Sequence, residues 1–383
     1  MRIKNFMLVL LITGIVFSES MCFAEAEPDA QNDKDTVSAS VEFIQKAAAR
    51  SHFYDGIMYY SGDGVSQNYK KAAECFQEAA DLGHAEAQYM LGYMYNRGYG
   101  VKQNYSEALK WYHKAEEQGL TEAQLGLGIM YYSGEGVKRD YKEALKWYRK
   151  AAEKGNDAAQ HSLGLMYFNG EGLKRDYKEA LKWFRQSAEQ GFVYAQYMLG
   201  YMYYEGYGAE QNYSEALKWF RKSAAQNHAV AQCYLGDMYS KGEGVTQDYS
   251  EAFRWYSKAA AQGIANAQNM LGFMYHNGLG VKQNTSESLK WVRKAAEQGN
   301  IAAQFNLGSA YYLGNGVKQN YAEAAKWYRK AAEQGDAQAQ YWLGHMYQNG
   351  KGMERNLMEA RIWYKKAADQ GQNNAKEALK HLK

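Results

Sequence analysis

Residues 84–119 read HAEAQYMLGYMYNRGYGVKQNYSEALKWYHKAEEQG and contain one copy of a repeated pattern. The Gly-x-Gly pair of this stretch recurs every 36 residues at nine places, beginning at Gly62 and Gly350 in the first and last copies, without an insertion. Tryptophan keeps the same period at eight places, and Cys75 takes its position in the first copy. A fixed period of this length indicates a repeat architecture. We therefore divide residues 48–371 into nine repeats.

Each repeat reads as two helices. In the quoted repeat, apolar residues at helical spacing predict a first helix over residues 85–95, which ends before Gly98. A second helix is predicted over residues 105–118, with Asn104 as its N-cap and Glu107 completing a capping box. Helix pairs of this kind cannot bury their apolar faces alone, so neighbouring pairs must stack. The sequence therefore predicts an all-α solenoid of nine 36-residue helix-turn-helix repeats.

Two glycine positions have a structural explanation. Gly119 is predicted to end the second helix in the left-handed conformation, and Asn227 replaces it once. Gly92 recurs inside the first helix of all nine repeats, although glycine in a helix costs about 1 kcal/mol relative to alanine. We expect a neighbouring helix to pack there so closely that no Cβ fits. The periodic tryptophans are expected to be core residues, because a residue kept in eight repeats holds the repeats together.

The N-terminus resembles a secretory signal. Residues 1–24 carry Arg2 and Lys4 ahead of a 12-residue apolar run, which is too short to span a membrane comfortably. We expect cleavage after Ala24 or Ala26, and a periplasmic or secreted protein. Residues 25–47 are a polar leader and the start of an N-terminal helix, with residues 25–40 expected to be disordered. No later segment is apolar enough to span a membrane, and residues 372–383 are expected to form a C-terminal capping helix.

The string Leu-Gly-x-Met-Tyr-x-x-Gly-x-Gly-Val, followed by Glu-Ala-x-Lys-Trp-Tyr and Ala-Ala-Glu-x-Gly, resembles the Sel-like repeat (SLR) family, relatives of tetratricopeptide repeats. The resemblance covers residues 48–371. It implies a right-handed α/α superhelix whose first helices line the concave surface, and a role as a protein-interaction scaffold. A cysteine-rich branch of the family has been linked to penicillin binding. The paired cysteines of that branch are absent here, and Cys75 and Cys233 are expected to be free thiols.

Motifs for catalysis, cofactors and metals are missing. No Walker-type G-x-x-x-x-G-K-[ST], S-x-x-K or G-x-S-x-G motif occurs, and none of the eight histidines has ligand spacing to another. We therefore expect no catalytic residue, no cofactor and no bound metal. The formal net charge of +3 and the mixed charges on the second helices argue against nucleic-acid binding.

The positions that vary between repeats are the candidates for binding. On the first helix the positions of Tyr89, Tyr93 and Asn96 lie opposite Leu91 on a helical wheel, and many of their equivalents are aromatic. Exposed aromatic residues often mark interfaces. The alternative is that stacking of the repeats buries part of this set. We name the following residues the first-helix stripe: Tyr89, Tyr93, Tyr132, Phe168, Tyr197, Tyr201, Tyr204, Phe273, Phe305, Tyr312, Tyr341 and His345.

These observations predict an exported, monomeric, non-catalytic scaffold that binds a protein or peptide partner along the first-helix stripe, in envelope processes or in contact with a host. The sixth repeat, with Cys233, Asp237 and Ser240 at the stripe positions, is expected to be a polar break. The alternative function is a cell-envelope enzyme, or a protein that binds β-lactams or peptidoglycan as the cysteine-rich branch does.

Overall fold

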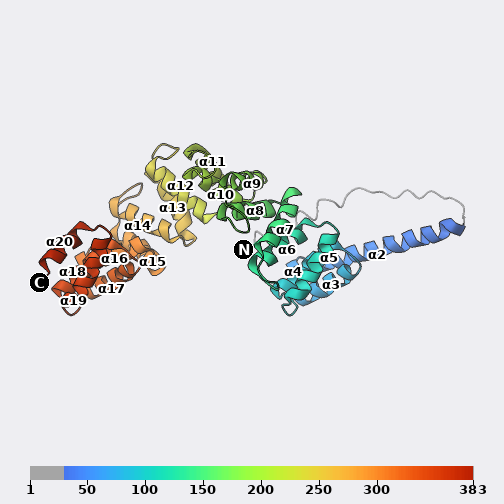
Figure 1. The fold of residues 1–383 in the computed structure, drawn as a ribbon, viewed down its shortest axis with the longest axis horizontal. Helices are drawn as coiled ribbons and strands as arrows, with labels where there is room; N and C mark the ends of the chain where they lie inside the picture. Colours follow the sequence, from blue (N-terminus) through green and yellow to red (C-terminus); the bar gives the residue numbers. More distant parts are fainter. Residues whose placement is uncertain (1–29, 383) are drawn as a thin grey trace. The chain divides into compact units, whose positions relative to one another are not determined.

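In the computed structural model, which describes residues 30–382, every regular element is an α-helix (Figure 1). The described helices fall into two compact units that divide between Asp176 and Tyr177. The first unit contains α2 (Ala30–Ser61), α3 (Tyr69–Asp81), α4 (Ala85–Arg97), α5 (Tyr105–Glu117), α6 (Thr121–Ser133), α7 (Tyr141–Glu153) and α8 (Asp157–Asn169). The second unit contains α9 (Tyr177–Glu189), α10 (Val193–Glu205), α11 (Tyr213–Ala225), α12 (Ala229–Lys241), α13 (Tyr249–Ala261), α14 (Ala265–Asn277), α15 (Thr285–Glu297), α16 (Ile301–Leu313), α17 (Tyr321–Glu333), α18 (Ala337–Asn349), α19 (Leu357–Asp369) and α20 (Asn373–His381). The predicted solenoid of helix-turn-helix repeats is confirmed.

Helix α2 departs from the sequence prediction. It begins at Ala30, inside the segment that we expected to be disordered, and continues for 32 residues. Residues 30–55 contain neither glycine nor proline, so nothing in the sequence interrupts the helix. The expectation of disorder is therefore wrong from residue 30 onward. The predicted signal segment, residues 1–24, lies outside the described residues.

The second helices begin at the predicted caps, but the capping box does not form. The side chain of Asn104 accepts hydrogen bonds from the backbone N–H groups of Ser106 and Glu107 at 3.1 and 3.2 Å. The backbone N–H of Asn104 instead donates to the carbonyl of Tyr95 at 2.9 Å. The Glu107 carboxylate pairs with Lys110 at 3.1 Å. A carbonyl of the first helix has thus taken the donor that the glutamate would need.

The helical glycines lie against an aromatic ring of the second helix. A Cβ built on Gly92 would come within 2.8 Å of a ring carbon of Tyr112. The same clash recurs in other repeats, for example at 2.6 Å between Gly236 and Tyr256. The expected close approach is confirmed, and the partner is a ring that crosses beneath the first helix.

The periodic tryptophans are largely core residues. Five of the eight are buried, for example Trp219 with 5% of its surface exposed, and the other three are partly buried. A lysine three residues later covers the outer face of several indoles, as Lys222 does at 4.1 Å from the ring centroid of Trp219. The predicted core role is confirmed, with a cation–π contact at the solvent boundary.

Buried glutamines connect successive repeats. Gln304 on α16 donates to the carbonyl of Ala296 at 3.2 Å and accepts from Gln334 at 2.8 Å. The same hydrogen bond joins Gln88 to Gln118 in the first unit. In the second unit it occurs in five glutamine pairs, the first being Gln196 with Gln226 and the last Gln340 with Gln370. Each of these buried glutamines donates to the second helix of the preceding repeat and accepts from the second helix of its own repeat, so together the two bonds set the spacing between one repeat and the next.

Candidate functional site

A cluster of tyrosines lies on two neighbouring first helices of the second unit. Tyr197 and Tyr201 of α10 stack with their ring centroids 6.3 Å apart. Tyr234 of α12 lies 6.0 Å from each of them and 5.4 Å from Tyr204. The ring of Tyr234 also stacks on Phe220 at 4.9 Å. We name Tyr197, Tyr201, Tyr204 and Tyr234 the tyrosine cluster.

The hydroxyl groups of this cluster are uncharged. Burial raises the pKa of Tyr204, and the hydrogen bond from its hydroxyl to Glu243, at 2.7 Å, raises it further. Burial is also the main cause of the raised pKa of Tyr197, Tyr201 and Tyr234. The rings are half-buried, so each presents an apolar edge together with a neutral hydroxyl. This combination suits contact with a polypeptide.

The stripe residues of the first unit pack in the same way. Tyr89 lies 5.8 Å from Tyr112 of its own repeat, and Tyr93 lies 6.0 Å from Tyr99. The hydroxyl of Tyr132 donates to Glu171 at 2.9 Å. Phe168 on α8 is half-buried.

Exposure varies more among the later stripe residues. Phe305 and Tyr341 contact the second-helix rings Tyr328 and Tyr364, at 5.6 and 5.7 Å respectively. His345 is half-buried beside Tyr341, at 6.5 Å.

Two of these later residues have the smallest and the largest exposed fractions of the stripe. Tyr312 is buried, with 9% exposed, and its hydroxyl accepts a hydrogen bond from Lys351 at 2.6 Å. Phe273 is the opposite case, with 48% exposed.

Partial burial, the alternative to an exposed stripe, therefore describes these residues better. Tyr312 is buried, Phe273 is exposed, and the other ten stripe residues are half-buried. The cause is the helical glycine, which lets the second-helix ring pass beneath the first helix and meet the stripe from below. The role of the stripe in binding stays a prediction.

Sequence reasoning missed two aromatic residues. Tyr234 and Trp342 occupy the same position of their repeats, one residue before the core leucine. Trp342 lies 6.3 Å from Tyr328 of the preceding repeat with the rings nearly parallel, as Tyr234 does on Phe220. A helical wheel places this position on the flank, which hides its contact with the repeat before. Its variation between repeats was the available signal.

The predicted polar break is satisfied internally. Asp237 accepts a hydrogen bond from the hydroxyl of Tyr256 at 2.6 Å. Cys233 is buried with 7% exposed, and burial raises the pKa of its thiol to about 12. Cys75 and Cys233 are both free, as predicted.

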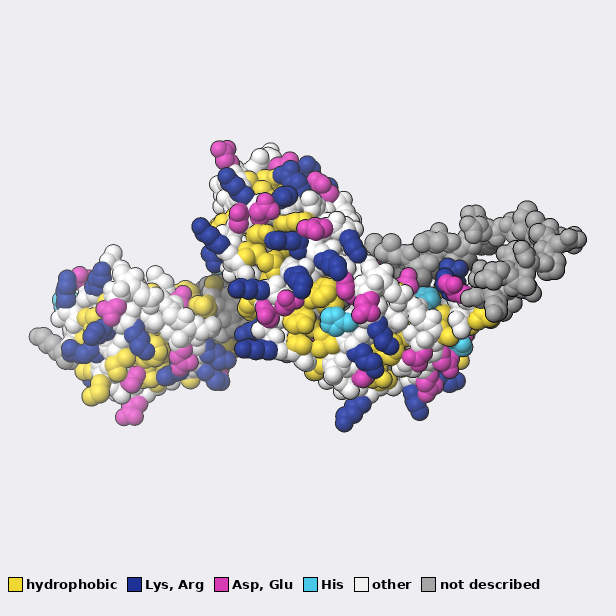
Figure 2. All heavy atoms as spheres, turned by 45° about the vertical axis from the view of Figure 1, so that its right-hand side comes forward, with side chains coloured by type: hydrophobic (Ala, Val, Ile, Leu, Met, Phe, Trp, Pro, Cys, Tyr) yellow, Lys and Arg dark blue, Asp and Glu magenta, His cyan; other side chains and the backbone are white. Residues whose placement is uncertain are grey.

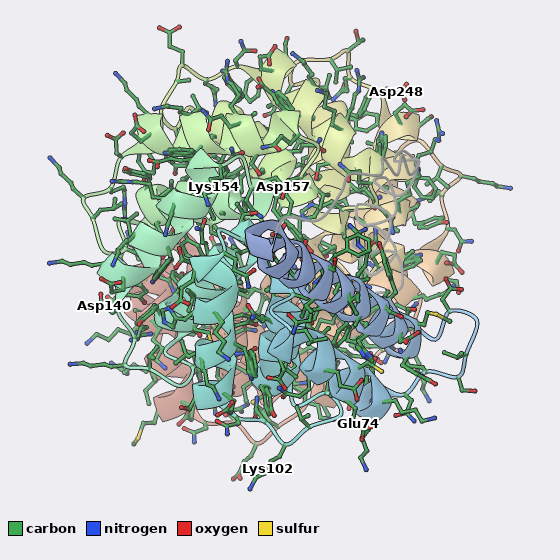
Figure 3. The ribbon with its side chains drawn as sticks, turned by 90° about the vertical axis from the view of Figure 1, so that its right-hand side faces the viewer. Glu74, Lys102, Asp140, Lys154, Asp157 and Asp248 are labelled. Carbon is green, nitrogen blue, oxygen red and sulfur yellow. The ribbon has the colours of Figure 1, made fainter. Side chains whose placement is uncertain are left out.

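The charged surface is mixed in sign. Figure 2 shows Lys and Arg side chains interspersed with Asp and Glu over the visible face. On α7, Lys146 pairs with Glu143 at 3.2 Å while both remain exposed. Lys102 and Asp140, next to the turns within repeats, lie at the outer edge of the ribbon in Figure 3. Pairs of this kind contribute about 0–1 kcal/mol each, and over the face of the described residues seen in Figure 2 their alternation leaves no broad patch of one sign.

Residues 30–382 contain neither a candidate metal site nor a candidate membrane-spanning helix. No three His, Cys, Asp or Glu side chains gather as a metal site would require in that part of the chain. Among the helices described there, none combines the length and the apolar character needed to cross a bilayer.

The helix pairs, the helical glycines and the repeated caps define an α/α solenoid of helix-turn-helix repeats. The Sel1 repeat family matches the chain at residues 49–84, 85–120, 121–156, 157–192, 193–228, 229–264, 265–300, 301–336 and 337–372. The chain belongs to this family.

Two solved structures are similar over most of the chain. One is c5321, "a protective antigen present in uropathogenic Escherichia coli strains displaying an SLR fold", at 36% identity and a TM-score of 0.66, covering 92% of this chain and 82% of that one. The other is a Sel1 repeat protein from Oxalobacter formigenes, at 31% identity and a TM-score of 0.64, covering 97% and 98%. No curated protein matches the chain.

Proposed function

We propose that this protein is an exported, non-catalytic scaffold that binds a protein or peptide partner with its first-helix stripe. The tyrosine cluster is the observation that carries the proposal. It gathers four uncharged phenol groups on two neighbouring helices, α10 and α12. Tyrosine is enriched at interfaces and has few rotatable bonds to immobilise on binding.

The repeat architecture supports this role. In a solenoid each repeat contacts only its neighbours, and the stacked helices present an extended surface. Core positions such as that of Leu91 recur from repeat to repeat, whereas the stripe positions change. A surface of varying aromatic and polar residues fits an extended or helical peptide, whose side chains each meet a different repeat.

Export rests on the sequence of residues 1–24, with its basic start and short apolar run. The description of the Escherichia coli relative as a protective antigen supports an exported protein as well. The proposed location is the periplasm or the outside of the cell, and the proposed state is a monomer. Fractionation of the producing cells distinguishes the two locations, and light scattering on the purified chain tests the monomer.

Binding is tested by capture and then by titration. The chain from residue 27 onward serves as bait, and the captured partner is titrated against wild type, Tyr201→Ala, and Tyr201→Ala with Tyr204→Ala. Each substitution that removes an anchor is expected to weaken binding about tenfold or more, because interface hot spots contribute about 2 kcal/mol or above. Circular dichroism confirms that each variant is folded.

The matched control lies on a second helix of the same repeat. Glu215→Ala with Lys218→Ala removes an exposed pair, 3.4 Å apart, without changing the net charge. This variant is expected to bind as wild type does. Loss of binding in the control together with full binding in the tyrosine variants would overturn the proposal and move the interface to the second helices. Hydrolysis of a β-lactam by the purified protein would contradict the non-catalytic part and favour the alternative function.

A further inference from the structure

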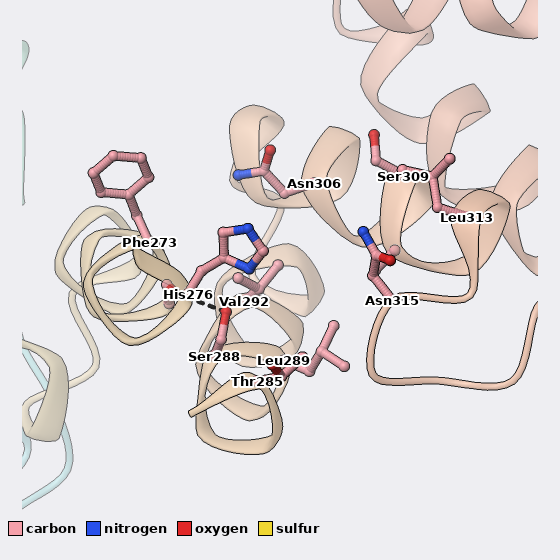
Figure 4. A pocket seen from close by; sticks show the side chains of 12 residues that line it. Phe273, His276, Thr285, Ser288, Leu289, Val292, Asn306, Ser309, Leu313 and Asn315 are labelled. Carbon is pink, nitrogen blue, oxygen red and sulfur yellow. Dashed lines mark hydrogen bonds between the residues drawn. The ribbon is translucent and has the colours of Figure 1, made fainter. Parts of the chain in front are cut away.

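The second unit contains an unfilled pocket between α14, α15 and α16 (Figure 4). Its volume is about 210 Å³. Val292 and Ala310 lie at its buried end, with 6% and 9% exposed. Phe273 and Leu313 flank its mouth, with 48% and 61% exposed. The pocket is therefore closed at an apolar floor and open to solvent at an apolar rim.

The pocket exists because a ring is missing from the seventh repeat. The position of Val292 holds tyrosine or phenylalanine in the other eight repeats. In the sixth and ninth repeats the ring, Tyr256 or Tyr364, fills the space beneath the first helix and is 0–1% exposed. In the seventh repeat a valine methyl meets Gly272 instead, and the rest of the ring's space is empty.

Neighbouring positions are also small here, so nothing else fills the gap. Ala310 occupies a position that is methionine in the other eight repeats. Thr285 replaces a residue that is tyrosine in seven repeats and leucine in one. Asn306 stands where Tyr234 and Trp342 cover the second-helix ring of the preceding repeat. Protein interiors are close-packed, so one missing ring flanked by two smaller residues, Thr285 and Ala310, and by no covering aromatic residue at Asn306 points to a site for a ligand.

The other repeats indicate where a hydroxyl group on such a ring would lie. The hydroxyl of Tyr364 donates to Gln348 at 2.7 Å. The hydroxyl of Tyr256 lies 3.4 Å from Ser240 and donates to Asp237 at 2.6 Å; the residue equivalent to Asp237 in the seventh repeat is Phe273, which has no polar group. The residue equivalent to Gln348 and Ser240 in the seventh repeat is His276. Figure 4 shows its imidazole extending from α14 towards Asn306.

A second polar group faces the same place. In four repeats the residue equivalent to His276 forms a hydrogen bond with the middle residue of the Gly-x-Gly turn in the following repeat. Tyr204, for example, donates to Glu243. Asn315 is the corresponding turn residue here and also lines the pocket. Among the described residues no hydrogen bond joins His276 to Asn315, which leaves polar groups at the rim for a ligand. No Asp, Glu, Lys or Arg lines the pocket, so its occupant is uncharged.

We propose that this pocket binds the phenol ring of a tyrosine side chain from a partner polypeptide, with the ring against Val292 and the hydroxyl at His276. A cavity of about 150 Å³ is enough to bind benzene in another protein, so one ring fits here. The exposed Phe273 and Leu313 at the mouth would contact the polypeptide on either side of the tyrosine. That the ring belongs to a polypeptide rests on the proposed function, whereas the affinity for a phenol ring does not.

The test uses p-cresol, which is the tyrosine side chain without its backbone. Binding to the full chain is followed by the methyl NMR signals of Leu289 and Ala310, which an aromatic ring in the pocket would shift. A dissociation constant on the order of 1 mM is expected for a ligand of this size. Val292→Tyr restores the ring of the other repeats and is expected to weaken binding at least tenfold.

Three further variants make the result specific. Ala310→Met fills the same space from α16 and is also expected to weaken binding at least tenfold, so the test does not depend on one variant. Lys290→Ala, on the exposed side of α15, is the control and should bind p-cresol as wild type does. His276→Ala is expected to reduce the preference for p-cresol over toluene by about three- to tenfold, the worth of one hydrogen bond.

The outcomes separate the two parts of the proposal. Equal binding of p-cresol to wild type and Val292→Tyr, or no binding to wild type, would overturn the pocket as a phenol site. If p-cresol binds, N-acetyl-tyrosinamide is expected to bind at least as tightly, because its backbone reaches the rim. Binding of p-cresol without N-acetyl-tyrosinamide would overturn the polypeptide source and assign the pocket to a free phenol. Both results are independent of whether the tyrosine cluster binds the partner.

Discussion

Lys154 breaks the chain of glutamine pairs in the first unit, and replacing it tests how much those pairs stabilise the fold. Gln124 is 0% exposed, and its side-chain oxygen has no hydrogen-bond partner. In the equivalent pair of the second unit, Gln226 donates to Gln196 at 2.9 Å and to the carbonyl of Gly191 at 2.8 Å. Lys154 makes only the second of these contacts, to Gly119 at 3.0 Å. Lys154→Gln should therefore gain one buried hydrogen bond and keep the exposed one.

The expected gain follows from the state of the acceptor. A buried polar group without a partner costs about 1–3 kcal/mol, and a hydrogen bond contributes about 0.5–1.5 kcal/mol net. We expect Lys154→Gln to raise the free energy of unfolding by about 1–2 kcal/mol. For a denaturant slope of about 3 kcal/mol/M, this raises the urea midpoint by about 0.5 M. Circular dichroism measures the midpoint, and hydrogen exchange of the α6 amides shows whether the gain is local.

The reverse substitution is the control. Gln226→Lys should remove the bond to Gln196 and lower the midpoint by a similar amount. If Lys154→Gln leaves the midpoint unchanged or lowers it, and Gln226→Lys does not lower it, the glutamine pairs do not stabilise the stacking. The assignment of repeat spacing to them would then be wrong.

Three further predictions concern the core and its response to acid. Trp219→Ala should lower the free energy of unfolding by about 3–5 kcal/mol, as truncation of a buried tryptophan does, and Trp342→Ala, at a half-buried residue, should lower it less. If urea denaturation shows equal losses of stability for the two variants, the periodic tryptophan position is not a core position. Gly236→Ala should destabilise the protein by about 1–2 kcal/mol because the new Cβ overlaps the ring of Tyr256, whereas a gain of about 1 kcal/mol would mean that helix propensity outweighs the clash. Burial lowers the pKa of His161 from 6.5 to about 4, so the unfolded chain binds more protons in this interval and stability should fall as the pH drops from 6.5 towards 4; His161→Leu should flatten this fall, and an unchanged pH profile by thermal melting would refute the assignment.

Local features of the sequence predicted most of the fold. The 36-residue period, the helix ends at Gly98 and Gly119 and the N-cap at Asn104 depend on residues within one or two turns of each other. Such short-range patterns are visible in a linear sequence. The glycine at position 92 also indicated a close approach, although the sequence did not identify the ring of Tyr112 as the partner.

Exposure was predicted less well, since it depends on contacts with other helices, which the pattern within one helix does not show. A helical wheel placed Tyr312 on the outside, yet it is buried with 9% exposed. The same wheel placed Tyr234 on a flank, where stacking of the repeats brings it onto Phe220. The capping box at Asn104 does not form for the same reason, because the backbone N–H of Asn104 donates to a carbonyl of the preceding helix.

The class of fold, the register of the repeats and the positions of their caps follow from the amino-acid sequence alone, because each rests on short-range geometry repeated along the chain. Which aromatic side chains face solvent, and which cover a neighbouring repeat, is settled only when the repeats pack together. The same packing leaves a pocket of about 210 Å³ where a ring is exchanged for Val292. The sequence shows that exchange as a single variation among nine repeats. Whether a missing ring becomes a pocket depends on whether neighbours move in to fill it, and here Thr285, Asn306 and Ala310 are too small to do so.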